Sequence, residues 1–270
     1  MPSGIETIAE AFARARANGR RAALMPYLMG GFPDLDTSRA IGLAYADAGA
    51  DLVEVGVPFS DPLADGPVIH AAATSALAAG ATLPAVLEVA HAIAERVPVV
   101  LMCYANPILV RGVDRFADAV AGARVSGVIV PDLPLEEAVE MRRACGRRGL
   151  ALVPLVAPTT PADRLERIGA AASGFLYTVS VTGTTGERTG VDGGLAGVIA
   201  RAAAHTRVPV AVGFGISTPE HAAAAVAAGA QGVIVGSRLV RAAAEADDPA
   251  TAVGELIRGF SAALSEPALG

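Results

Sequence analysis

The sequence contains no lysine. Its 270 residues include 21 basic side chains, and every one of them is an arginine. Without a lysine amine the chain cannot form a Schiff base with a carbonyl substrate or hold pyridoxal phosphate covalently, and it cannot build a phosphate loop that depends on lysine. Amine-based covalent catalysis is therefore excluded.

Cysteine is also scarce. Cys103 and Cys145 are the only two, they lie far apart without a CxxC pattern, and their neighbours are apolar or small. This pattern predicts reduced core thiols in a reducing compartment. The histidines show no spacing typical of metal ligands, so we expect no metal site. The four histidines are His70, His91, His205 and His221.

An excess of positive charge is missing as well. Acidic residues outnumber basic ones by 27 to 21, which gives a net charge of −6, and no basic run is present. Nucleic acid and anionic membrane are therefore not expected as partners. The longest stretch without charged residues, 66–87, contains two prolines, and residues 1–21 show no signal-type apolar run, so we expect a cytoplasmic protein.

What the sequence does contain is a repeated unit. An Ala-rich amphipathic segment ends at a glycine and leads into a short β-branched strand, as in AYADAGADLVEV (44–55) and AVAAGAQGVIV (225–235). Continuous apolar strands that alternate with helices are typical of a parallel sheet buried on both faces. The predicted strands begin near Leu24, Leu52, Val97, Gly127, Ala151, Phe175, Val208 and Gly232.

Eight such units predict an α/β fold, a (β/α)8 TIM barrel, as a single domain over residues 1–270. A doubly wound open sheet is the alternative, but the first strand is followed by LMGGFPD rather than GxGxxG. Two connections are unusually long, 57–69 after the second strand and 180–194 after the sixth. In a barrel these loops would lie on the catalytic face.

Glu54 is a carboxylate inside an apolar strand. In LVEVGVP, strand alternation places Leu52, Glu54 and Gly56 on one face and the two valines on the other. A glutamate in this position is either a buried, hydrogen-bonded group or a general acid or base whose pKa is raised by desolvation. The loop that follows adds Asp61 and Asp65, which could be turn residues, but three carboxylates so close together favour a catalytic role for at least one.

Three glycine-rich strand ends follow late in the chain: TGTTG (182–186), GFGIS (213–217) and VGS (235–237). They expose backbone N–H groups where no side chain blocks an anion, which favours a phosphate site at the ends of the last two strands. The segment STPE (217–220) also fits a helix capping box. Asp132 and Tyr177, at other strand ends, could line a pocket or serve in packing.

The string EVGVPFSDPLADGPVI (54–69) resembles the signature of the tryptophan synthase α-subunit family. The resemblance extends in order through PYLMGGFPD, MCYANPI, VPDLPLEE, FLYTVSVTGTTG, VGFGIS and VIVGS, and so covers essentially the whole chain.

The resemblance implies a carbon–carbon lyase that cleaves indole-3-glycerol phosphate into indole and glyceraldehyde 3-phosphate. It implies a β subunit as partner, in an α2β2 assembly, which receives the indole and carries the pyridoxal phosphate; this chain would need no cofactor. Glu54 would be the proton shuttle and Asp65 the carboxylate that binds the indole N–H. Protonation of the indole ring supplies the electron sink that a chain without lysine requires.

The remaining roles follow from the same resemblance. The phosphate is expected on Gly186, Gly213, Gly215, Gly236 and Ser237. The indole pocket is expected to be lined by Tyr27, Met102, Tyr104, Ile129, Leu155, Tyr177 and Phe214. Loop closure and partner signalling are expected at Pro58, Asp61, Pro62 and Thr185.

Two other hypotheses stay open at this stage. One is another phosphate-binding barrel of the same pathway, such as indole-glycerol-phosphate synthase, which relies on a catalytic lysine, or phosphoribosylanthranilate isomerase. The other is a non-catalytic partner subunit, although packing alone does not require the pair Glu54 and Asp65.

Overall fold

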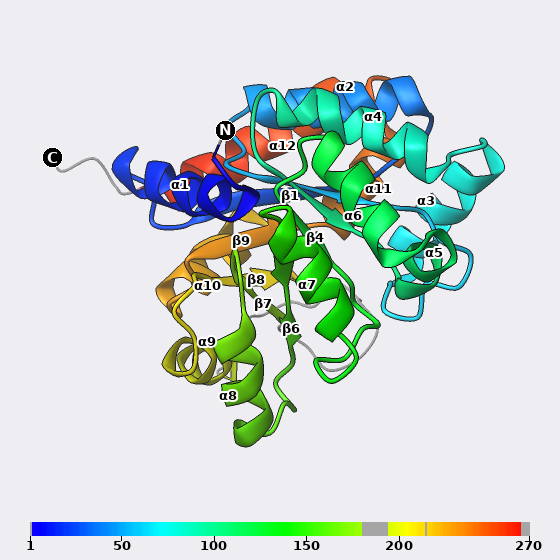
Figure 1. Ribbon diagram of the computed structural model, residues 1–270. Coiled ribbons are helices and arrows are strands. Elements are labelled where there is room, and N and C mark those ends of the chain that lie inside the picture. The colour runs from blue at the N-terminus through cyan, green and yellow to red at the C-terminus, as the bar shows by residue number, and fades with distance from the viewer. Residues whose placement is uncertain (1, 180–193, 214, 266–270) are drawn as a thin grey trace, which may run out of the picture.

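The strands of the computed structural model, which describes residues 2–179, 194–213 and 215–265, form one parallel sheet (Figure 1). The described strands are β1 (Ala23–Met29), β2 (Val53–Gly56), β3 (Val99–Met102), β4 (Gly127–Ile129), β5 (Ala151–Val153), β6 (Leu155–Val156), β7 (Leu176–Val179), β8 (Val210–Gly213) and β9 (Gly232–Val235).

Helices follow most of these strands and surround the sheet. Within the described ranges they are α1 (Gly4–Ala17), α2 (Leu35–Asp47), α3 (Pro67–Ala78), α4 (Leu83–Ala94), α5 (Ala105–Arg111), α6 (Val113–Gly122), α7 (Val139–Arg147), α8 (Ala162–Ala171), α9 (Gly194–Ala204), α10 (Pro219–Ala227), α11 (Ser237–Glu245) and α12 (Pro249–Leu264).

The sheet closes on itself at Pro154. The strand order is β5-β4-β3-β2-β1-β9-β8-β7-β6, so β5 and β6 stand at opposite ends of the sheet, yet only Pro154 separates them in sequence. Proline has no N–H to donate to a ladder, which interrupts the strand at this point. With β5 and β6 counted as one strand, the fold is the predicted (β/α)8 barrel, and the open doubly wound alternative is wrong.

The two faces of the strands carry different cores, as alternation predicts. Val53 and Val55 face outward into the cluster between the sheet and the helices. Leu52 faces inward, with Val100 and Tyr177 of other strands, into the cluster that fills the barrel. Glu54, between the two outward valines, therefore projects into the barrel interior.

Helix α1 covers the end of the barrel at which the strands begin. Ser3 and Glu6 cap it reciprocally: the Glu6 N–H donates to Ser3 Oγ (3.2 Å), and the Ser3 N–H donates to Glu6 Oε2 (2.7 Å). Ile8 and Phe12 belong to the inner cluster, and a Cβ on Gly232, the first residue of β9, would lie 3.1 Å from the Phe12 ring. Figure 1 shows α1 at one end of the barrel and α5 at the other.

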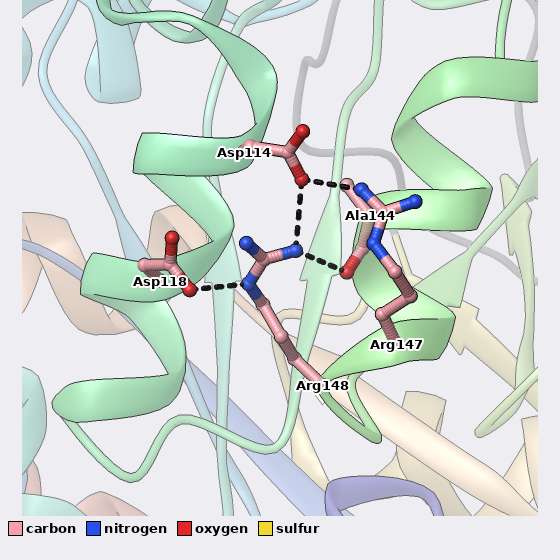
Figure 2. Close-up of polar contacts among 5 residues, drawn as sticks. All are labelled: Asp114, Asp118, Ala144, Arg147 and Arg148. Atoms are coloured by element: carbon pink, nitrogen blue, oxygen red, sulfur yellow. Dashed lines mark hydrogen bonds and ion pairs between the residues drawn. The ribbon is translucent and has the colours of Figure 1, made fainter.

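Helices α6 and α7 are joined by an arginine cluster (Figure 2). The Arg148 Nε donates to Asp118 (2.6 Å), and its Nη1 donates both to Asp114 and to the Ala144 carbonyl (3.0 Å each). Arg147 pairs with Asp114 as well. The cluster places positive charge at the C-terminal end of α7, where the helix dipole favours it.

Most strand positions agree with the sequence prediction, with starts that differ by at most two residues. Both cysteines are buried free thiols, as predicted. The predicted capping box STPE is wrong: Thr218, not Ser217, caps α10, and its hydroxyl accepts the His221 N–H.

Within the described ranges no single helix has the length and apolarity to cross a membrane; α3 and α4 pass that test only as a pair, bent by 112°.

Candidate active site

Glu54 is fully enclosed near the end of β2. It is 1% exposed, and its Oε2 has no hydrogen-bond partner within the described residues. Burial raises the pKa of Glu54 to about 8, and the negative charge of Asp65 adds to the effect. A carboxyl group with such a pKa exists in both protonation states near neutral pH, so it can give and take a proton.

Asp65 lies in the loop between β2 and α3, directly before Gly66, the N-cap of α3. Burial raises the pKa of Asp65 to about 6, against the opposing effects of a hydrogen bond from Tyr104 and of the nearby His70. The Tyr104 hydroxyl also accepts the Ala64 N–H (3.0 Å), which fixes the loop beside the start of α5. Asp65 is thus held over the barrel while the larger part of its population is ionised at pH 7.

The two carboxyl groups line the same cavity, which is partly open to solvent. Of the described residues, those that line it are Tyr27, Glu54, Asp65, Gly66, Val68, Ile69, Met102, Tyr177, Gly215, Ile216, Ser217, Ile234, Gly236, Ser237, Arg238 and Arg241.

Two tyrosines cross the cavity floor over strand-end glycines. A Cβ on Gly56 would lie 2.0 Å from the Tyr27 hydroxyl, and a Cβ on Gly213 would lie 2.2 Å from the Tyr177 hydroxyl. No larger residue fits either position without a shift of the ring. Burial, followed by the charges of the two carboxylates, raises the pKa of both tyrosines, so both hydroxyls stay protonated.

The part of the cavity formed by the start of α11 is suited to an anion. Gly236 is the N-cap of α11, and Ser237 is its first residue. The first N–H groups of a helix have no partner within the helix and point out of its positive end. Arg238 and Arg241 line the cavity from the same helix. The cavity therefore contains both carboxyl groups and positive charge.

Eight of the predicted site residues line this cavity: Tyr27, Glu54, Asp65, Met102, Tyr177, Gly215, Gly236 and Ser237. Three others lie outside the described residues: Thr185, Gly186 and Phe214.

The remaining predicted residues do not line the cavity directly. Ile129 and Leu155 belong to the inner cluster that fills the barrel. Tyr104 donates a hydrogen bond to Asp65, and Gly213, without a side chain, leaves room for the Tyr177 hydroxyl. In the loop after β2, Pro58 and Pro62 are buried and Asp61 is exposed.

Sequence reasoning missed Arg238 and Arg241 as lining residues, and it assigned Ser217 to a cap. The signal for the arginines was available: both follow the VGS strand end at positions 3 apart, on one face of the next helix. Asp132, an undecided candidate, accepts the Ala105 N–H (2.8 Å) and so supports the start of α5.

The fold and this cavity define the class: a TIM-barrel enzyme whose site is formed at the C-terminal ends of the strands. The sequence model of the family "Tryptophan synthase alpha chain" matches residues 12–263. The chain belongs to this family.

Individual relatives agree. The tryptophan synthase alpha chain of Prochlorococcus marinus (strain MIT 9313) is 49% identical over 242 residues, which cover 89% of this chain and 88% of that one. A Mycobacterium tuberculosis tryptophan synthase structure is 36% identical with a TM-score of 0.90, and covers 99% of this chain and 100% of that chain. The Pyrococcus furiosus structure, of a tryptophan synthase α2β2 complex, is 36% identical with a TM-score of 0.83, and covers 88% and 97%.

Proposed function

We propose that this chain is the lyase subunit of tryptophan synthase and cleaves indole-3-glycerol phosphate into indole and glyceraldehyde 3-phosphate. One observation carries the proposal: Glu54, buried and with a pKa near 8, shares a cavity with Asp65 and with the positive end of α11. A substrate with an indole at one end and a phosphate at the other matches this distribution of charge.

Glu54 serves as both acid and base in the proposed cleavage. It gives a proton to C3 of the indole ring, and the ring then accepts the electron pair of the breaking bond between C3 and the glycerol carbon. It recovers a proton from the hydroxyl on that carbon, which becomes the aldehyde. Glu54 ends in its starting state, and no water is consumed.

Asp65 binds the indole N–H in this scheme. Protonation at C3 puts positive charge on the indole nitrogen, and the Asp65 carboxylate stabilises that charge most in the transition state. The substrate phosphate is placed on Gly236 and Ser237, where the helix N-terminus and Arg238 favour an anion. Gly215, which also lines the cavity, belongs to the same proposed cradle.

A β subunit is the proposed partner at the mouth of the barrel. Leu63, in the loop after β2, is 87% exposed, and Leu109 and Val110 on α5 are 63% and 81% exposed. The bond from Ala64 to Tyr104 holds this loop against the start of α5, and Figure 1 shows the two side by side. Exposed apolar side chains at one edge are typical of a docking surface, and the Pyrococcus furiosus relative forms an α2β2 complex. We assign pyridoxal phosphate to the partner, since this chain has no lysine to hold it.

The decisive experiment measures indole release from indole-3-glycerol phosphate by the purified chain, alone and after addition of a tryptophan synthase β subunit. We expect slow cleavage alone and faster cleavage with the partner. Cleavage that ignores the partner would contradict the docking proposal. The absence of cleavage in both states would contradict the catalytic proposal and leave a non-catalytic subunit.

A further inference from the structure

Tyr27 stands directly beside Glu54 in the barrel wall. The two residues are partners in the β1–β2 ladder, and both line the cavity. The Tyr27 hydroxyl occupies the space over Gly56, the next inward-facing position after Glu54 on β2. Two residues along a strand correspond to roughly 7 Å, so the hydroxyl lies on the side of Glu54 toward the cavity mouth and within reach of a glutamate side chain that turns that way.

Both polar groups lack a strong partner in this arrangement. The Tyr27 hydroxyl faces only the Met29 thioether among the described residues, at 3.9 Å, and sulfur is a weak acceptor. Within the described part of the chain, the Glu54 Oε2 is buried without a hydrogen bond. Buried polar groups are destabilising unless they are paired. A bond between these two groups would satisfy both of them.

We propose that Tyr27 is a positioning residue for Glu54: its hydroxyl donates a hydrogen bond to the Glu54 carboxylate whenever that carboxylate is ionised. The inference rests on the proposed function, in which Glu54 alternates between its acid and its carboxylate form. A hydrogen bond to a charged acceptor is stronger than one to a neutral acceptor. The bond therefore favours the ionised form and turns the carboxylate toward the cavity mouth, where the substrate hydroxyl would lie.

Several other titratable groups surround Glu54 and stay unchanged in the test below. They are Asp65 in the loop after β2, His70 on α3, Tyr104 beside α5, Tyr177 on β7, and Arg238 and Arg241 on α11. Because burial keeps Tyr27 itself protonated, the hydroxyl is a donor throughout the range in which Glu54 titrates.

The test is Tyr27→Phe, which keeps the ring and removes the hydroxyl. We expect the pKa of Glu54 to rise by about one unit, the size expected for the loss of one hydrogen bond to a charged group. Two readouts report it: the limb of the kcat/KM profile for indole release that belongs to Glu54, and an infrared titration of the carboxyl band that Glu54→Gln removes.

Tyr45→Phe is the matched control. Tyr45 is also fully buried, but its hydroxyl donates to the Tyr27 backbone carbonyl (3.1 Å) and does not line the cavity. This variant loses a tyrosine hydroxyl and some stability, and it should leave both the profile limb and the infrared titration in place.

The outcomes separate the two proposals. An upward shift in Tyr27→Phe and none in Tyr45→Phe supports the positioning role. An unchanged titration in Tyr27→Phe overturns it, even if turnover falls, because a purely structural defect would not move the pKa. If the unmodified chain releases no indole, the proposed function fails, and the infrared titration still decides whether Tyr27 binds Glu54.

Discussion

At the scale of single residues, the chain uses burial to adjust one glutamate. Glu54 owes its position to an inward-facing place on β2, and its raised pKa follows first from desolvation and then from Asp65. The same burial that prepares the group for proton transfer makes its ionised form unfavourable. Activity and stability are therefore opposed at this position.

Glu54→Gln should fold normally and lose indole formation by at least about 10²- to 10⁴-fold, because an amide cannot exchange the proton. Rates of indole release, with circular dichroism as the check on folding, measure this. Turnover within tenfold of the unmodified chain would contradict the assigned role.

The Glu54→Gln variant should also be more stable than the unmodified chain at high pH. The pKa of Glu54 is about 8 in the fold against an ordinary value of 4.5, so the folded state holds a proton that the unfolded state has lost between these values. Wild-type stability contributed by this group is complete below about pH 4.5 and is lost as the pH rises through 8. Urea unfolding at pH 5 and pH 8.5 should show that Glu54→Gln gains more at the higher pH; an equal gain would contradict the raised pKa.

Asp65→Asn should lower kcat/KM by about 10²-fold, since the charge that develops on the indole nitrogen loses its counter-charge. It should also lower the pKa of Glu54, because the Asp65 charge helps to raise it. Glu88→Gln, at an exposed position on α4, is the control for the loss of a carboxylate. An unchanged kcat/KM in Asp65→Asn would contradict the placement of the indole.

The inward direction of the Glu54 side chain was predictable from the sequence, because the alternation of side chains along a strand is a local property. The contact between Asp65 and Tyr104 was not, since it joins the loops after β2 and β3, which the pairing of these two strands brings together. Arg238 and Arg241 follow the VGS strand end at helical spacing, a signal present in the sequence, but the direction of α11 relative to the cavity follows from how β9 packs beside β1.

At the scale of elements, α1 closes the end of the barrel at which the strands begin. Phe12 is 1% exposed and contacts the inner cluster, including Phe175 at a ring distance of 6.1 Å. Phe12→Ala should lower the free energy of unfolding by about 3–5 kcal/mol through loss of packing. Urea denaturation measures this, and a loss below about 1 kcal/mol would show that α1 contributes little to the core.

The loop after β2 and helix α5 form the proposed docking surface. Leu109→Asp puts a charge into this surface at an exposed position, so the free chain should keep its slow turnover while activation by the β subunit falls. Ile5→Asp, on an exposed apolar residue of α1 at the other end of the barrel, is the control. Equal activation of both variants would place the partner elsewhere.

At the scale of the whole molecule, helix C-termini gather at the end of the barrel where the strands begin, and arginines lie beside them: Arg96 follows α4, Arg124 follows α6, and Arg148 follows α7. The positive charge of each arginine interacts favourably with the negative end of the helix dipole beside it. The number of strands and their starts were predictable because each βα unit repeats the same local pattern, whereas the interruption at Pro154 becomes meaningful only in the closed sheet.

The position of α1 also limits the route by which substrate and products can reach and leave the cavity. Helix α1 closes the end of the barrel at which the strands begin, and the inner cluster fills the barrel between α1 and the cavity. In the part of the chain that the structure describes, the cavity therefore opens toward the other end of the barrel. Substrate and products would then pass through the same opening. A protein bound over this opening would be the first to meet each departing product. The route of the indole to a partner would thus depend on α1, which closes the opposite end of the barrel, as well as on the partner itself.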